Sequence, residues 1–538
     1  MTLVLGTVAS FQFSTRPCLA DLRTVALSGQ PAPQTSYDVA FANFEAPVLN
    51  RFGQTAFKAF LSGTGLNSAN DSGIWSEGYG DHNLNLVARA GSQAAGVSDG
   101  GNYSFLGLPV LNGNGQTAFN ANLIGIGVDD SNNVGIWFEH SSGLKLIARR
   151  GDQAPGTPSG VLFNGLAPPV LNDAGQTAFW AGLIGPGLTL TSTGFWSEGS
   201  GTLDLVVRAG DYALGTPSGV KYSGFVDSPV LNAAGQIAFL GLLSGSNVDS
   251  SNNRGIWSET FNDLELVARQ GNPAPGTSGE ASFFRVYSPV INTSGHIAFA
   301  ANLTHSILGI WSGGFDNLKP VVLTRTQAPG TPEGTQFFSV GSPVINSVGR
   351  ISFWAALTGG DVSTANNEGI WSEAGHSGEV LLLARKGSHA AGTPTGTTYY
   401  AFDPPVINSA GQTAFLSTLS GTGVNFTNDL GIWGTAPSGT VQLVVRSGDL
   451  LEVAPSDFRT IQSVSFVANS GNEDGRRSGF NDSGQLVFAA RFTDGSSGVF
   501  VSNAVAIPEP TSMKLFALLI PLILNLHLFR RYSQKPPS

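Results

Sequence analysis

The sequence has little of the chemistry on which disulfide-stapled and zinc-binding proteins depend. Only one of its 538 residues is cysteine, Cys18, so the chain has neither an intrachain disulfide nor a cysteine zinc site. Charged residues make up 12% of the chain, against about 25% in typical soluble proteins. The surface must therefore consist mostly of neutral polar groups. The net charge of −10 disfavours sequence-independent binding to phosphate backbones, so we expect no nucleic-acid partner.

Glycine, by contrast, is abundant, with 70 residues. Because glycine costs roughly 1 kcal/mol at a helical position, this content argues against a helical bundle. An all-β fold with many tight turns accommodates glycine much better.

An internal repeat dominates the chain. The segment PVLNRFGQTAF, which starts at Pro47, returns seven times with small changes, the last copy being the degenerate GFNDSGQLVF at Gly479. The interval varies from 54 to 73 residues, with a mean of about 62. Each copy is anchored by one asparagine: Asn50, Asn112, Asn172, Asn232, Asn292, Asn346, Asn408 and Asn481.

Each repeat carries two further markers and a loop. One marker is G-[IF]-W, which first occurs at Gly73 and is weakened to GVF at Gly498. The other is an apolar run with a basic tip, such as LVAR ending at Arg89, followed by a loop such as GDQAPGTPSG. PV[LI]N, GQTAF, GIW and LVAR are all short, rich in β-formers and bounded by Gly, Asn, Asp or Pro, which predicts four strands per repeat. The N-x-x-G element suits a tight hairpin turn.

Eight four-stranded units of about 60 residues predict an all-β, eight-bladed β-propeller over residues 21–504. The last repeat stops after its third strand, GVFVS, whereas the stretch LRTVALSGQPAP at Leu22 matches a fourth strand and its loop. We therefore expect the N-terminal strand to complete the last blade and close the ring. The alternative is an open solenoid, which would leave edge strands at both ends.

Seven of the nine tryptophans lie in the G-[IF]-W motif. A large aromatic side chain in every blade is expected to pack between neighbouring sheets. The alternative is a ring of aromatic residues that stack on sugars.

The C-terminal segment, residues 505–538, predicts a single membrane-spanning segment. Residues 515–529 carry no charge and are followed by Arg530 and Arg531. This span is shorter than the roughly 20 residues that cross a bilayer comfortably. The arginine pair would hold that end in the cytoplasm and leave the propeller outside.

Pro508, Glu509 and Pro510, a short apolar span and the pair Arg530–Arg531 resemble the PEP-CTERM sorting signal of exported bacterial proteins. The tandem repeats are similar to the NxxGxxAF repeats often found upstream of such tails. The resemblance implies export, processing by an exosortase-type enzyme near the PEP motif and a link to exopolysaccharide or biofilm matrix. It assigns no activity to any residue. Lys514, Asn525 and His527 depart from the pattern of the tail.

Residues 1–20 are expected to form an atypical signal peptide. Thr2–Phe13 is apolar, but no basic residue precedes it. The alternative is a displaced start.

Motifs for catalysis are scarce. The seven histidines fall at non-equivalent repeat positions, and the sequence contains no metal-binding H-E-x-x-H element and no P-loop. An acidic pair drawn from different blades stays open as an alternative. No cofactor is expected. Ca²⁺ held by Asp/Asn-rich turns is the alternative, and those turns include Asp129, Asp130, Asn132, Asn133, Asp249, Asn252 and Asn253.

Two features are candidates for ligand binding. The first is a belt of arginines at equivalent positions, which could hold anionic sugars: Arg89, Arg149, Arg208, Arg269, Arg325, Arg385 and Arg446. The alternative, which we favour, is local pairing with acidic residues such as Glu77, Glu198, Glu259 and Glu373. The second is the irregular last interval with its charged residues Glu473, Asp474, Arg476 and Arg477. A plain surface loop is the alternative there.

These observations together predict an exported, non-catalytic repeat protein of the cell surface or extracellular matrix. Its expected partners are glycans or proteins, an exosortase-type enzyme, and the membrane through the C-terminal segment. The alternatives are an extracellular enzyme acting on polysaccharide and a purely structural envelope spacer.

Overall fold

A computed structural model describes residues 22–506 apart from short gaps at 79–81, 99, 190–191, 261–262, 278–280, 374–377 and 471–472. The predicted signal peptide and the sorting tail from residue 507 onward, with Pro508, Glu509, Pro510, Arg530 and Arg531, lie outside the described residues. Among the described residues, no helix has the length and hydropathy that a membrane crossing requires.

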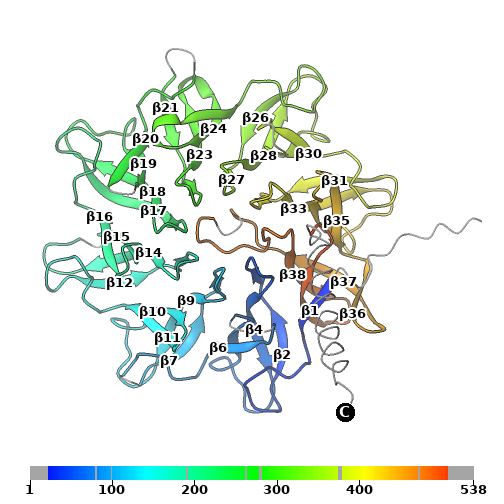
Figure 1. The fold of residues 1–538 in the computed structure, drawn as a ribbon, viewed down its shortest axis with the longest axis horizontal. Helices are drawn as coiled ribbons and strands as arrows, with labels where there is room; N and C mark the ends of the chain where they lie inside the picture. Colours follow the sequence, from blue (N-terminus) through cyan, green and yellow to red (C-terminus); the bar gives the residue numbers. More distant parts are fainter. Residues whose placement is uncertain are drawn as a thin grey trace, which may run out of the picture.

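Eight antiparallel sheets surround a central axis, as the sequence predicts (Figure 1). Blades 1 to 4 contain the following strands: β2 (Ala40–Phe44), β3 (Val48–Leu49), β4 (Thr55–Ser62), β5 (Ser72–Ser76) and β6 (Asn85–Arg89); β7 (Asn102–Leu106), β8 (Val110–Leu111), β9 (Thr117–Ile124), β10 (Val134–His140) and β11 (Gly143–Arg149); β12 (Leu162–Leu166), β13 (Val170–Leu171), β14 (Thr177–Ile184), β15 (Thr193–Ser197) and β16 (Asp204–Arg208); β17 (Lys221–Leu231), β18 (Ile237–Ser244), β19 (Arg254–Glu259) and β20 (Leu264–Arg269).

Blades 5 to 8 continue the pattern, and blade 5 adds two short 3₁₀ turns at Thr304–Ser306 and Phe315–Asn317. Their strands are β21 (Phe283–Val286), β22 (Val290–Ile291), β23 (Ile297–Leu303), β24 (Leu308–Gly313) and β25 (Lys319–Leu323); β26 (Gln336–Val340), β27 (Val344–Ile345), β28 (Ile351–Thr358), β29 (Glu368–Ser372) and β30 (Leu381–Arg385); β31 (Thr397–Phe402), β32 (Val406–Ile407), β33 (Thr413–Gly421), β34 (Leu430–Thr435) and β35 (Val441–Arg446); β36 (Leu450–Ala454), β37 (Asp457–Ser465), β38 (Leu486–Phe492), β39 (Ser497–Ser502) and β1 (Leu22–Leu27).

The N-terminal strand closes the ring. β1 pairs antiparallel with β39, so that the last sheet runs β1-β39-β38-β37-β36. Buried residues of blade 8, such as Val487 and Val499, pack in one cluster with Phe41 and Trp75 of blade 1. The predicted closure is therefore confirmed, and the open solenoid is wrong.

The first strand of each blade differs from the prediction. In six blades PV[LI] forms only a two-residue strand that pairs with the inner half of the GQTAF strand, for example Val48 with Ala56; in blade 4 it is part of the longer β17, and in blade 8 a single bridge takes its place. The outer half of the GQTAF strand pairs with a further segment, β2 in blade 1, which the four predicted strands do not include. A β-bulge interrupts this outer pairing in every blade, for example between Phe41 and Asn43.

Tryptophan fills the space between the blades. The seven tryptophans of the G-[IF]-W motif are completely or almost completely buried. In blade 4, Trp257 stacks on Phe239 with ring centroids 6.0 Å apart and meets the edge of Tyr222 at 4.9 Å. Its indole N–H donates to the carbonyl of Leu214 in the preceding loop. Packing is therefore the role of these residues, and the alternative of sugar-stacking tryptophans in this motif is wrong.

The glycine of the same motif is a consequence of this packing. A Cβ on Gly255 would lie 2.6 Å from the ring of Trp257, closer than a carbon contact allows. The indole thus lies over the backbone of its own motif, and only glycine fits beneath it.

We expect Trp257→Ala to destabilise the fold by about 3–5 kcal/mol, because it removes a completely buried aromatic side chain. The matched control is Phe338→Ala, since Phe338 is 65% exposed. Thermal and denaturant unfolding of both variants would check this. Equal losses of stability in the two variants would contradict the assigned packing.

Candidate functional site

Eight asparagines form a closed ring of hydrogen bonds around the axis. The side-chain amide of each repeat asparagine donates to the backbone carbonyl of the corresponding asparagine in the next blade, at 2.9–3.1 Å. The last of these bonds runs from Asn481 in blade 8 to Asn50 in blade 1. All eight side chains are at most 2% exposed. The N-x-x-G motif is therefore both a turn and an inter-blade fastener.

The same asparagines also shape their own turns. The Oδ1 of Asn232 accepts from the backbone N–H groups of Ala234 and Gln236, and its amide donates to the Gln236 side chain. Gly235 supplies the positive φ, +83°, that ends the turn. The hydrogen-bonding capacity of the buried amide is thus fully used.

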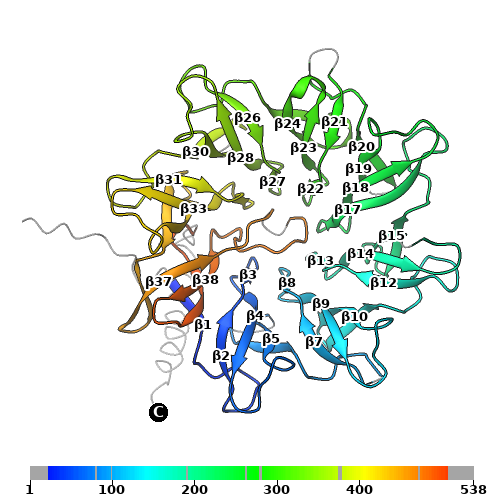
Figure 2. The same cartoon turned by 180° about the vertical axis from the view of Figure 1, so that it is seen from behind.

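The irregular segment of blade 8 enters the centre of this ring. Val464 precedes Asn481 by 17 positions, whereas the corresponding Phe402 in blade 7 precedes Asn408 by six. The additional residues fall within the segment 466–479, which we call the hub loop. Figure 2 shows it extending from between β37 and β38 across the centre of the ring toward the inner strand β13 on the far side.

The hub loop bonds to all seven other blades. Its backbone carbonyls accept from Leu49, Leu171 and Leu231 of blades 1, 3 and 4. Its charged side chains take several of the remaining contacts. The Glu473 carboxylate accepts from Thr293 of blade 5 and Ser409 of blade 7, and Arg477 donates to carbonyls of blades 1 and 2. The Ser470 hydroxyl accepts from the Ile345 N–H of blade 6.

The hub loop therefore lies inside the molecule. Both predictions made for this segment, a ligand-binding loop and a plain surface loop, placed it on the surface. Asp474 is completely buried and pairs with Arg476 of the same loop. Burial raises the pKa of Glu473 above its ordinary value and lowers the pKa of Arg477 to about 10. Glu473 and Arg477 bond to other blades, and Arg476 pairs with Asp474 within the loop, so the expected binding loop is replaced by an internal plug.

The seven belt arginines contact their own blades. In five of them the Nε donates to the carbonyl of an asparagine in a turn of the same blade, as Arg149 does to Asn132 at 2.8 Å; the others are Arg89, Arg269, Arg385 and Arg446. Arg208 pairs with Asp211, and Arg325 donates to Ser306. These arginines therefore bond within their own blades, as we favoured, but the prediction that glutamates are their partners is wrong. Binding of an anionic ligand by this belt stays a prediction.

Those glutamates have another function. Glu198 accepts from the N–H and hydroxyl of Thr177, and Glu77 does the same for Thr55 while it also pairs with Arg23 of β1. Glu259 and Glu373 accept from the backbone N–H groups of Ile237 and Ile351. Burial raises the pKa of Glu259 and Glu373. Each of these carboxylates therefore accepts a hydrogen bond from the first backbone N–H of the GQTAF strand in its blade.

The side chains of the Asp/Asn-rich turns form hydrogen bonds within their own turns. Asp129 accepts from the N–H and hydroxyl of Ser131, while Asn132 bonds the N–H of Asp129 and the carbonyl of Gly127. Asp249 and Asn252 repeat the pattern in blade 4. No group of three or more His, Cys, Asp or Glu residues gathers into a metal-binding arrangement within the described part of the chain.

A different set of residues lies open on the surface, at the bulge of the first strand. The eight bulge residues are Ala42, Ser104, Asn164, Ser223, Phe284, Phe338, Tyr400 and Gln462. Only the three of consecutive blades 5, 6 and 7 are aromatic. Their side chains are 58%, 65% and 54% exposed. Because five blades form the same bulge without an aromatic residue, the fold does not require this row.

A cavity lies at one of the blade boundaries beside the row. Between blades 5 and 6, a cavity of about 240 Å³ is lined by Tyr287, Asn302, Leu308 and Ser339, among others. The buried Oδ1 of Asn302 has no hydrogen-bond partner among the described residues. By strand pairing, Leu308 and Ser339 correspond to Glu368 and Ala401 at the next boundary and to Arg254 and Arg285 at the previous one.

The boundary between blades 6 and 7 contains a connected polar and aromatic cluster. Glu368 accepts from the indole N–H of Trp354 at 3.0 Å and lies 3.6 Å from the Lys386 ammonium. Lys386 in turn lies 4.7 Å from the ring centre of Tyr400. An exposed aromatic face beside hydroxyl-binding charges suits the apolar and polar sides of a sugar ring.

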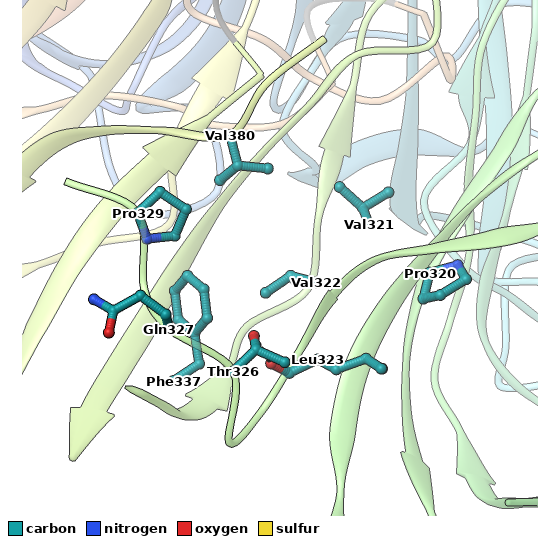
Figure 3. A pocket seen from close by; sticks show the side chains of 9 residues that line it. All are labelled: Pro320, Val321, Val322, Leu323, Thr326, Gln327, Pro329, Phe337 and Val380. Carbon is teal, nitrogen blue, oxygen red and sulfur yellow. Dashed lines mark hydrogen bonds between the residues drawn. The ribbon is translucent and has the colours of Figure 1, made fainter. Parts of the chain in front are cut away.

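A second cavity, of about 310 Å³, is a weaker candidate. Figure 3 shows its lining, which is mostly apolar and comes from β25, β26 and neighbouring loops. Its polar side chains face their own loop: Gln327 bonds the backbone of Ala328 and Gly334, and Thr326 bonds Leu323. The cavity thus offers no free polar group to orient a ligand.

A family model described as a family of unknown function, DUF7453, matches residues 9–153, 123–309 and 304–514. The chain belongs to this family. The DUF7453 matches together cover every blade, and no curated protein matches the sequence.

Solved structures share the propeller architecture at low identity. The β-propeller domain of the trilobed protease from Pyrococcus furiosus is 9% identical, with 76% of this chain and 99% of that chain covered and a TM-score of 0.39. The Dos1 propeller is 10% identical (88% and 95% covered, TM-score 0.36). The periplasmic gluconolactonase PpgL of Pseudomonas aeruginosa is 13% identical (75% and 96% covered, TM-score 0.30). These likenesses concern the fold and say nothing about activity.

We expect Asn232→Asp to destabilise the ring by about 2–4 kcal/mol near neutral pH. The carboxylate loses the two donations to Gln236 and Asn292 and places a charge beside their oxygens. The loss should shrink in acid, where a protonated carboxyl can donate again. Calorimetry at several pH values would check this, with the exposed Asn83→Asp as control. A loss that did not depend on pH would contradict the assigned donor role.

We expect Glu473→Gln to change the pH dependence of stability. Since burial raises the pKa of Glu473, the folded protein binds a proton at this carboxylate more tightly than the unfolded chain does. The wild type therefore loses stability as the pH rises from about 4.3 through this raised pKa, and the glutamine variant does not. Between pH 4.5 and 7, the melting temperature of the variant should therefore rise relative to that of the wild type. Glu333→Gln, at an exposed site, should show a constant difference, and a constant difference for both would refute the burial argument.

Proposed function

We propose that this DUF7453 chain is an exported, non-catalytic binding protein whose propeller binds a glycan on the face that carries the aromatic row. The row of Phe284, Phe338 and Tyr400 is the observation that carries the proposal. Exposed aromatic side chains in adjacent blades bury large apolar area on binding, and the scaffold itself does not need them.

The hub supports a binding mode on the surface. The hub loop occupies the axis with buried, internally bonded residues. A ligand therefore lies across blade boundaries rather than in a central channel. The neighbouring charges Glu368 and Lys386 are spaced to contact hydroxyl groups beside Tyr400.

Export and anchoring belong to the same proposal. They rest on the resemblance of residues 508–531 to a PEP-CTERM tail, which implies processing by an exosortase-type enzyme and a place at the cell surface or in the matrix. A membrane-anchored form, held by residues 515–529, would precede processing. A protein partner in place of a glycan, a polysaccharide-acting enzyme and a structural spacer are the competing readings.

Affinity electrophoresis of the full chain through gels that contain the exopolysaccharide of the producing organism tests the proposal. We expect retardation without the appearance of new reducing ends. Phe338→Ala and Tyr400→Ala should each weaken the interaction about tenfold, the usual effect of truncating a central aromatic anchor. Tyr37→Ala is the matched control, since Tyr37 is 96% exposed but lies outside the row.

The other outcomes decide among the competing readings. New reducing ends would identify an enzyme. Retardation that is unchanged in both row variants would place the binding face elsewhere. No retardation would refute glycan binding and leave a protein partner or a spacer.

A further inference from the structure

Two arginines on neighbouring blades lie at the boundary between blades 4 and 5, where β19 contacts β21. Arg254 begins β19 of blade 4, and Arg285 lies in β21 of blade 5 next to the exposed Phe284. At the other boundaries, the residue that corresponds to Arg254 is Ser72, Val134, Thr193, Leu308, Glu368, Leu430 or Ser497. The residue that corresponds to Arg285 is Asn43, Phe105, Gly165, Gly224, Ser339, Ala401 or Ser463. The cation pair is therefore particular to this boundary.

These two guanidinium groups lack a counterion. Neither makes a hydrogen bond or ion pair within the described ranges, whereas Arg23, Lys386 and Arg476 each pair with a carboxylate. Arg254 is half-buried, and burial together with the nearby charge of Arg285 lowers its pKa. In a chain with net charge −10, two adjacent unpaired cations are an unfavourable arrangement that a bound anion would relieve.

The surroundings orient the pair without neutralising it. The Arg285 guanidinium lies 5.4 Å from the ring centre of Tyr287, which also lines the cavity between blades 5 and 6. Asp227, the carboxylate at this boundary, accepts a hydrogen bond from Ser288. Phe284 then leads from the arginine pair into the aromatic row.

We propose that Arg254 and Arg285 bind an anionic group of the ligand, so that the protein selects an acidic polysaccharide with carboxylate or sulfate substituents. This inference rests on the proposed glycan binding and adds the charge of the ligand. One anionic substituent lies between the two guanidinium groups, and the sugar units that follow it stack along Phe284, Phe338 and Tyr400. Planar guanidinium groups bind both kinds of oxyanion through paired N–H donors.

Three polymers with one backbone test this: dextran, carboxymethyl-dextran and dextran sulfate. We expect retardation of the full chain by at least one charged polymer and none by dextran, and the two charged polymers distinguish carboxylate from sulfate. Arg254→Gln and Arg285→Gln should each weaken binding about tenfold, and rising salt should weaken it further. Arg254→Lys should retain part of the affinity because the charge remains.

Two further variants make the test specific to the site. Asp227→Asn removes a negative charge at this boundary and should strengthen binding severalfold, an effect that a neutral ligand would not produce. Asparagine also tolerates the φ of +61° at this position. Arg491→Gln, an exposed arginine of blade 8 on the opposite side of the ring, removes the same charge and should have no effect.

Each alternative result overturns the inference. Failure of both charged dextrans to bind would refute it, even if the native exopolysaccharide is bound. Binding of the native polymer that depends on Tyr400 but not on Arg254 or Arg285 would refute the anionic ligand and leave glycan binding intact. Equal losses in Arg491→Gln would show a general effect of charge. Absence of binding to every polymer would refute both proposals.

Discussion

The buried amide of the repeat asparagine joins the turn chemistry of one blade to the closure of the whole ring. One oxygen holds its own hairpin turn while the amide nitrogen reaches the next blade, so local and global structure depend on the same side chain. A buried donor without a partner costs about 1–3 kcal/mol, which means that each blade stabilises its neighbour by satisfying it. The tryptophan clusters fill the outer part of seven boundaries, Phe500 takes this place between blades 7 and 8, and the asparagine ring fixes the inner part.

Much of this architecture could be predicted from the sequence. Repetition fixed the number of blades, and the split last repeat indicated that the N-terminal strand completes blade 8, because both depend on patterns that recur along the chain. The outer half of each first strand escaped detection. Its bulge breaks the alternation of buried and exposed residues, as at Phe337, Phe338 and Ser339, and two further residues, here 341–342, separate it from PV[LI]N.

The candidate site was harder to predict, since its residues belong to different repeats. Glu473 looked like part of a charged surface loop because nothing in the sequence reveals that Thr293 and Ser409 are its partners. The belt arginines recur in seven of the eight blades, where each contacts its own blade. The residues that distinguish one sector, such as Phe338 and Arg254, are variations at positions where the repeat tolerates several side chains. Strand pairing in the structure identifies equivalent positions in different blades. It thereby distinguishes residues that recur with the repeat from residues that are particular to one sector.

The hub loop also has a consequence for how such a chain can change over generations. Tandem repeats readily gain or lose a unit by duplication or deletion. Here one loop carries a different contact for each of the seven other blades, from the Leu49 N–H to the Ser409 hydroxyl. A ring with one unit more or fewer would no longer match the order of these contacts around the axis. The contacts of the hub loop therefore restrict the ring to eight blades.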